Sequence, residues 1–148
     1  MIKPVEIVEA MRIALEARNY NDFVKCFAED AVLELPFALP GSPSRFEGIH
    51  QIRARFGDTS QLHTINKLFD LHEVTAVQHQ GLDPDVVTVE LRITGKNIAT
   101  DAIFEVSSSI AVIRFKNSQI VHYRDYPNTM GLAGVIGLLP QLAASLSK

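Results

Sequence analysis

The sequence predicts an α+β fold in which helices pack on one face of a curved antiparallel sheet. In the front part of the chain, apolar residues recur at helical spacing, whereas residues 68–126 are rich in Val, Ile and Thr and largely alternate with polar residues. Turn-forming residues separate the later segments, which favours an antiparallel meander. Helices at the front of a chain and strands at its back are typical of the α+β class. A chain of 148 residues fits one domain, residues 1–148, with a single core.

The first helix is expected to begin at Pro4, where the missing N–H costs nothing, and to run to about Arg18. Its apolar face consists of Ile7, Val8, Met11, Ala14 and Leu15. Asn21 or Asp22 can cap a short second helix that ends near Asp30. This second helix is expected to bury Phe23 and Phe27.

A short strand over residues 31–35 is expected next. Residues 36–44 contain three prolines and a glycine, so they form a loop, either a plain connector or a lid over a cavity. Gly48 then opens a third short helix. Its apolar face consists of Ile49, Ile52 and Phe56.

Four longer strands are expected over residues 68–79, 86–94, 103–115 and 119–126. In the second of these, Val87, Val89, Leu91 and Ile93 face one way, and Thr88, Glu90, Arg92 and Thr94 face the other. The polar face is either an ordinary solvated sheet face or part of a cavity wall, because the alternation fits both. In the third strand, Ser107 and Ser109 are expected to share a face with Ala111 and Ile113.

A final apolar helix is expected after Pro127, with Asn128 or Thr129 as its cap. Gly131, Gly134 and Gly137 fall three residues apart in it. Each glycine costs helix stability, about 1 kcal/mol relative to Ala. We therefore expect close packing of this helix against the sheet or against a second subunit.

The composition limits the classes of partner. A net charge of −3 without a Lys/Arg cluster argues against nucleic acid and against an anionic membrane surface. The single Cys26 forms no internal disulfide, the N-terminus lacks the apolar stretch of a signal peptide, and the run from Met130 to Leu139 is too short to span a bilayer. The five histidines show no metal-ligand spacing. These observations predict a cytoplasmic protein without a metal.

The segment Tyr123-Arg124-Asp125-Tyr126-Pro127-Asn128 holds the most informative residue. Aspartate is a poor strand former, because its short side chain bonds its own backbone and packs badly on a pleated surface. Asp125 is therefore either a member of an ion pair at the strand end, with Arg92 or Arg124 as partner, or a functional group in a cavity wall.

Three passages, taken in order, resemble the nuclear-transport-factor-2-like superfamily and its SnoaL-like group. They are Phe27–Pro36, Phe46-Glu47-Gly48 with the short helix after it, and Ile120–Asn128 with the following apolar helix. The resemblance covers nearly the whole chain. It implies a cystatin-like cone, in which a curved antiparallel sheet and N-terminal helices enclose a conical apolar pocket, and a homodimer formed through the sheet.

The resemblance also implies site residues. In SnoaL-like polyketide cyclases and in limonene epoxide hydrolases, the aspartate of the terminal segment is catalytic, and Asp125 matches it. The positions of the ketosteroid isomerase base and tyrosine hold Leu35 and Met11 here, so that reaction is not expected. Epoxide hydrolases of this superfamily pair their terminal acid with an Arg and a second Asp on a middle strand, and these two positions hold Glu90 and Arg92 here. The cyclases also have a supporting histidine on the penultimate strand, and its position holds Ala111.

These considerations predict a small enzyme of the isomerase, cyclase or lyase type that needs no cofactor and acts on a hydrophobic, carbonyl-bearing or polycyclic molecule. Asp125, desolvated by apolar neighbours, is expected to be the general acid/base, with Arg92 as an anchor and Tyr123 as a hydrogen-bond donor. The expected pocket residues are Met11, Leu15, Leu33, Leu35, Phe37, Glu90, Ser107 and Ser109. The alternatives are a non-catalytic ligand-binding or dimeric accessory domain, and a protein-interaction module.

Overall fold

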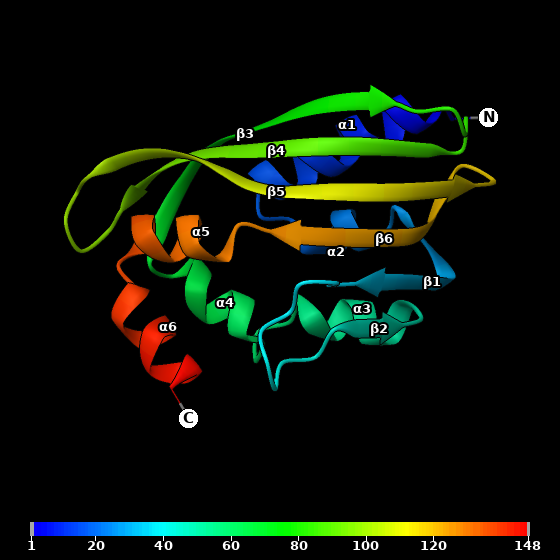
Figure 1. Cartoon of the computed structure of the whole chain (residues 1–148). Helices are drawn as coiled ribbons and strands as arrows, with labels where there is room; N and C mark the ends of the chain where they lie inside the picture. The colour runs from blue at the N-terminus through cyan, green and yellow to red at the C-terminus, as the bar shows by residue number, and fades with distance from the viewer. Residues whose placement is uncertain (1, 148) are drawn as a thin grey trace.

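A computed structural model describes residues 2–147 as a curved sheet with helices packed against it (Figure 1). The helices are α1 (Pro4–Glu16), α2 (Tyr20–Val24), α3 (Ile49–Arg55), α4 (Gln61–Asn66), α5 (Thr129–Ile136) and α6 (Leu139–Leu146). The strands are β1 (Phe27–Glu34), β2 (Arg45–Glu47), β3 (Phe69–Gln80), β4 (Val86–Asn97), β5 (Ile103–Lys116) and β6 (Gln119–Pro127). The predicted α+β class is confirmed.

The six strands form one sheet in the order β2-β1-β6-β5-β4-β3. Strands β3 to β6 form the expected antiparallel meander, and β2 pairs antiparallel with β1. Strand β1 runs parallel to β6, so the sheet is not antiparallel throughout. This parallel pair brings the inward-facing residues of β1 beside those of β6, with Leu33 opposite Tyr123.

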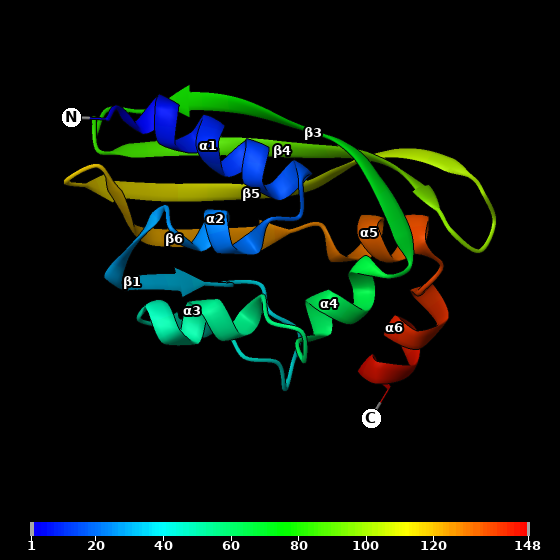
Figure 2. The same ribbon diagram turned by 180° about the vertical axis from the view of Figure 1, so that it is seen from behind.

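Helices α1 and α2 lie across one face of the sheet, as Figure 2 shows from behind. The core between these layers combines the apolar face of α1 with the inward side of β4 and β5. Val8 and Met11 of α1 are fully buried, as are Val89 of β4 and Ala111 of β5. The alternation in β4 leaves open which of its faces is solvated; in the structure Val87, Val89 and Leu91 point inward and are buried.

A β-bulge at Ser108 divides β5 into two registers. Leu91 pairs with Ser109, but the next residue, Arg92, pairs with Ser107. An extra residue in one strand reverses the facing of everything beyond it. Ser109 therefore shares the inward face with Ala111, as expected, whereas Ser107 does not.

The ends of several elements differ from expectation. Strand β1 begins at Phe27, so the second helix is shorter than predicted, and Asn19 caps it by accepting a hydrogen bond from the Asp22 N–H. The short elements α4 and β2 were not predicted. The final helix is two helices, because Gly137 takes the left-handed conformation (φ 79°) that ends α5.

Two of the three glycines of this region, Gly131 and Gly137, have local explanations. A Cβ on Gly131 would lie 2.2 Å from the amide nitrogen of Asn128, the residue that caps α5, while a Cβ on Gly134 would meet only Leu139 at 3.8 Å. Helix α5 packs against β5 of the sheet, which agrees with one of the two expected packings, whereas packing against a second subunit stays a prediction.

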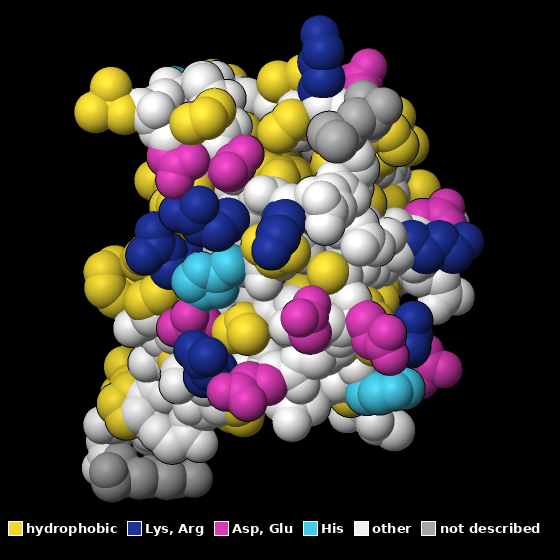
Figure 3. Space-filling view, turned by 90° about the vertical axis from the view of Figure 1, so that its right-hand side faces the viewer, with side chains coloured by type: hydrophobic (Ala, Val, Ile, Leu, Met, Phe, Trp, Pro, Cys, Tyr) yellow, Lys and Arg dark blue, Asp and Glu magenta, His cyan; other side chains and the backbone are white. Residues whose placement is uncertain are grey.

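The described helices include none that is long and apolar enough to cross a membrane. On the face that carries the N-terminus, acidic, basic and apolar side chains are interspersed (Figure 3). That face shows no extended area of a single charge sign, in agreement with the small net charge of −3.

Candidate active site

A cavity of about 550 Å³ lies between the inward face of the sheet and the helices at its open end. Its walls come from β1, β3, β4, β5 and β6, from the loop over residues 36–44, and from residues of all six helices. Most of the lining side chains are apolar, among them Leu33, Leu91, Ile93 and Leu132. Such a volume, with a few convergent polar groups, is typical of small-molecule sites.

Asp125 is one of these polar groups. It lies on β6 opposite Ala111 of β5, and both residues belong to the inward face. Its Oδ1 atom is buried and has no hydrogen-bond partner among the described residues. Burial raises the pKa of Asp125 from 3.8 to about 6, although Arg55 and the Ser109 hydroxyl favour the charged form. The carboxyl group is thus held in the wall of the cavity, and residues 2–147 supply no ion-pair partner for it at contact distance.

Tyr123 lies two residues before Asp125 on the same face of β6 and also lines the cavity. Its ring packs on Phe27 with a centroid distance of 5.7 Å and on Phe23 at 6.2 Å. Burial, followed by the negative charge of Asp125, raises the pKa of Tyr123 well above its usual value. The phenol therefore stays protonated and able to donate a hydrogen bond.

Arg55, the last residue of α3, is the cation of this site, and the sequence analysis missed it. Its guanidinium lies 5.3 Å from the Phe46 ring centroid and 5.8 Å from that of Phe56. Burial lowers the pKa of Arg55, while Asp125 and Tyr123 raise it. One signal was available: Arg55 follows the core residue Ile52 by three positions, so both share a face of the helix.

Five of the expected pocket residues line the cavity: Leu15, Leu33, Leu35, Phe37 and Ser109. Phe37 lies at its rim, 72% exposed, and its ring meets that of Tyr126 at 5.1 Å. Met11 is not a lining residue. It is fully buried in the core between α1 and the sheet.

The expectation that Arg92, Glu90 and Ser107 belong to the pocket is wrong. Arg92 is exposed on the outer face of β4, where it donates to Glu105 at 2.9 Å and to the Ser107 hydroxyl at 2.9 Å. Glu90 bonds His79 across the same face at 2.6 Å. Because Val89 and Leu91 point inward, residues 90 and 92 between and after them point outward. The bulge at Ser108 places Ser107 opposite Arg92, so Ser107 also lies on the outer face.

The proposed ion pair of Asp125 with Arg92 or Arg124 is therefore not formed. Arg92 pairs with Glu105, and Arg124 stands on the outer side near Glu34, whose pKa it helps to lower. The outer face of the sheet is the ordinary solvated one, and Asp125 faces the other way.

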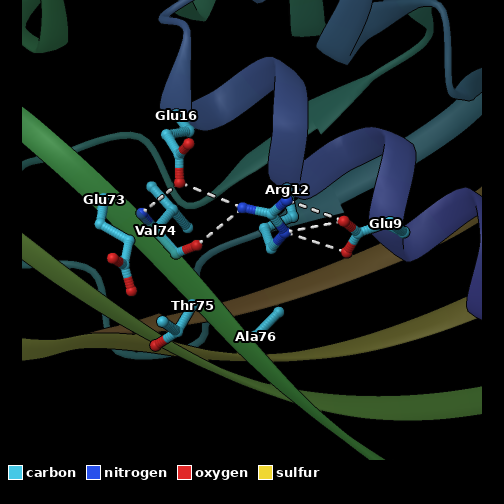
Figure 4. Close-up of a pocket in the computed structure, with 7 residues that line it drawn as sticks. All are labelled: Glu9, Arg12, Glu16, Glu73, Val74, Thr75 and Ala76. Carbon is cyan, nitrogen blue, oxygen red and sulfur yellow. Dashed lines mark hydrogen bonds and ion pairs between the residues drawn. The ribbon is translucent and has the colours of Figure 1, made fainter.

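A second hollow lies between α1 and the edge strand β3 (Figure 4). Three of its four charged residues bond one another: Arg12 bonds Glu9 at 2.7 Å and Glu16 at 3.1 Å. Arg12 also donates to the Val74 carbonyl at 3.0 Å, and Glu16 accepts from the Val74 N–H at 2.9 Å. These bonds occupy backbone groups on the free edge of β3 and so block pairing with another strand. The bonds of Arg12 and Glu16 stabilise the packing of α1 on β3, while Glu73 and Thr75, which also line the hollow, have no side-chain hydrogen bond or ion pair among the described residues.

The described residues contain no group of three or more His, Cys, Asp or Glu side chains that could hold a metal ion. Cys26 is half-buried, and burial raises the pKa of its thiol. A raised thiol pKa suits a structural residue rather than a nucleophile.

Comparisons with known proteins agree with this geometry. The family model of the SnoaL-like domain matches residues 8–123. A PhzA/B-like protein of Pseudomonas aeruginosa is 31% identical over 129 residues, which cover 84% of this chain and 82% of that protein. The protein YesE of Bacillus subtilis is 28% identical over 137 residues, covering 91% and 88%.

Solved structures share the fold. A candidate isomerase from Bacillus subtilis superposes with a TM-score of 0.74 at 27% identity, covering 90% of this chain and 92% of that one. A ketosteroid isomerase-like protein from Catenulispora acidiphila gives 0.67 at 21% identity, covering 95% and 98%. A candidate polyketide cyclase from Pseudomonas putida gives 0.65 at 16% identity, covering 91% and 98%. The last two show likeness of fold alone.

Proposed function

Because this chain belongs to the family of SnoaL-like domains, we propose that it is a small enzyme of the isomerase, cyclase or lyase type. It acts without a cofactor on a hydrophobic, carbonyl-bearing small molecule, with Asp125 as general acid/base. One observation carries the proposal: the Asp125 carboxyl lines a largely apolar cavity, and its Oδ1 is buried without a hydrogen-bond partner among the described residues. The candidate isomerase from Bacillus subtilis, similar over 90% of this chain, supports the reaction type.

The pKa of about 6 suits proton transfer at neutral pH. The carboxylate would take a proton from the carbon next to a substrate carbonyl. The C–H bond breaks, an O–H bond forms on Asp125, and the electron pair passes to the carbonyl oxygen as an enolate. Where the substrate carries a C=C bond conjugated with the enolate, return of the proton to the far carbon of this dienolate moves the double bond and gives an isomer. Attack of the enolate carbon on a second carbonyl of the same molecule closes a ring, with the proton passing to the new alkoxide.

Tyr123 is placed to support the enolate. Its raised pKa keeps the phenol protonated, so it can donate to the oxygen on which negative charge develops. The apolar lining, with residues such as Leu33 and Leu132, keeps water away and strengthens this interaction. Arg92, exposed on the outer sheet face, has no part in this mechanism.

A non-catalytic ligand-binding domain is the second candidate, and one observation favours it. Asp125 is the only Asp, Glu or His among the described residues that line the cavity. A proton relay between two carboxyl or imidazole groups of the described residues is therefore not available, and Asp125 would have to act as the single acid/base group of the reaction.

The test is deuterium exchange. The protein is incubated in D₂O with a panel of hydrophobic ketones, and deuterium next to the carbonyl is measured by mass spectrometry. The wild type is expected to exchange at least one ketone, and Asp125→Asn is expected to lower that rate by about 10³-fold, within the range for loss of a general base and its positioning.

Asp58→Asn is the matched control, because Asp58 is exposed and is not among the residues that line the cavity. Equal exchange by wild type and Asp125→Asn would overturn the catalytic role of Asp125. Binding of ketones without exchange by any variant would favour the second candidate.

A further inference from the structure

The charges inside the cavity are unbalanced. Its described lining contains two cations, Arg18 and Arg55, and one carboxylate, Asp125. An unbalanced charge in a largely apolar site is costly unless a ligand or solvent compensates it. The cavity as a whole therefore favours a ligand that brings one negative charge.

The two arginines differ in the contacts that their guanidinium groups make within the protein. Arg18 is used for structure: it donates to the carbonyls of Asn66 at 2.9 Å and Phe69 at 2.8 Å. Its guanidinium also lies 4.6 Å from the Phe69 ring centroid. These contacts fix Arg18 between α4 and β3 and engage both of its terminal nitrogens, which leaves its buried Nε without a partner among the described residues. Because paired bonds to a carboxylate need two free donors side by side, Arg18 is less suited to bind one than Arg55 is.

Arg55 has no comparable partners. Among the described residues, its guanidinium takes part in no hydrogen bond and no ion pair that meets ordinary geometric limits, and its ring contacts with Phe46 and Phe56 leave the N–H groups available. The charge of Asp125 attracts the Arg55 guanidinium electrostatically, without a hydrogen bond between the two side chains among the described residues. The planar guanidinium, held against aromatic rings, is suited to bind a carboxylate through two parallel hydrogen bonds.

We propose that the cavity takes a hydrophobic oxo acid, a carbonyl compound that carries a carboxylate, and that Arg55 binds this carboxylate. This inference rests on the proposed function, since it places the carbonyl end of the same ligand at Asp125 and Tyr123. The carboxylate would supply the missing negative charge, and the hydrocarbon part would contact Leu33, Leu91 and Leu132.

The test compares acids with their uncharged amides, which match them in shape. The probes are 2-naphthoate, 4-phenylbutyrate and decanoate, each with the corresponding primary amide, measured by isothermal titration calorimetry. The wild type is expected to bind at least one acid about tenfold or more tightly than its amide, as one charge-assisted bidentate contact allows. Arg55→Gln is expected to remove this preference and leave amide binding nearly unchanged.

Arg53→Gln is the matched control, because Arg53 is on the same helix but exposed and not in the cavity lining. It is expected to keep the preference for the acid. If Arg55→Gln fails to fold, Arg55→Lys tests the same point, since it retains the charge but not the paired donors, and a preference reduced to a few-fold is expected.

A wild type that prefers amides, an Arg55→Gln variant that keeps the acid preference, or failure of all three acids to bind at about 1 mM would each overturn the inference. Failure of this inference can be distinguished from failure of the proposed function. Exchange that depends on Asp125 without a preference for acids would reject only the oxo acid, whereas a preference for acids without exchange would reject only catalysis.

Discussion

At the scale of single residues, the site consists of Asp125, Tyr123 and Arg55, contributed by β6 and α3. The first two could be predicted, because strand alternation places residues 123 and 125 on one face and the family resemblance marks Asp125. Arg55 could not be assigned to the site from the sequence alone, since it is seventy positions from Asp125 in sequence and its proximity to that residue depends on how α3 packs on β1. Arg92 looked suitable only because its position in β4 did not reveal which face was solvated.

Tyr123→Phe tests the role of the phenol. The ring would keep its contacts with Phe23 and Phe27, so binding and stability should change little, while loss of the donor should slow exchange by about 10²-fold. The exchange rate and the affinity for the same ketone are measured together. Tyr126→Phe, at the outer face of β6, serves as control. An unchanged exchange rate in Tyr123→Phe would show that the phenol is only a packing residue.

At the scale of elements, the long strands were predictable because their pattern of Val, Ile and Thr repeats over many residues. The short elements α4 and β2 carry too few residues for a period to be visible. The bulge at Ser108 was not predictable either, because it depends on pairing between β4 and β5 rather than on the composition of β5. Its consequence is functional: it turns Ser109 toward Asp125 and Ser107 away.

Gly95 of β4 has neighbours from β3 and β5 where a side chain would lie. A Cβ at this position would lie 2.4 Å from the Asp70 carbonyl oxygen and 2.9 Å from Cζ of Phe104. Gly95→Ala is therefore expected to lower the free energy of unfolding by about 1–3 kcal/mol, the usual cost of overpacking. Urea denaturation provides the measurement.

Gly81→Ala is the matched control, because a Cβ on Gly81 would meet no atom within 4 Å. Its effect should stay within about 0.5 kcal/mol. Equal stability of the two variants would mean that the three strands are not packed as closely as the structure shows.

At the scale of the whole molecule, the fold keeps Asp125 in a cavity wall at a cost in stability. Its pKa of about 6 in the folded chain lies above the ordinary value of 3.8, so the folded state binds this proton more tightly than the unfolded state. The free energy of unfolding should therefore fall as the pH rises from about 4 to about 6 and then level off, as far as this residue is concerned. An asparagine, which stays uncharged, avoids this loss.

The measurement that tests the account most directly is the free energy of unfolding of the wild type and of Asp125→Asn from about pH 4 to pH 8, with Asp58→Asn as control. The stability gained by Asp125→Asn over the wild type should grow through this range and reach roughly 1–3 kcal/mol above pH 7, the free energy that corresponds to the raised pKa. Asp58→Asn should show no such growth. A difference between Asp125→Asn and the wild type that does not change with pH would contradict the account, because Asp125 would then not be a desolvated carboxyl poised for proton transfer.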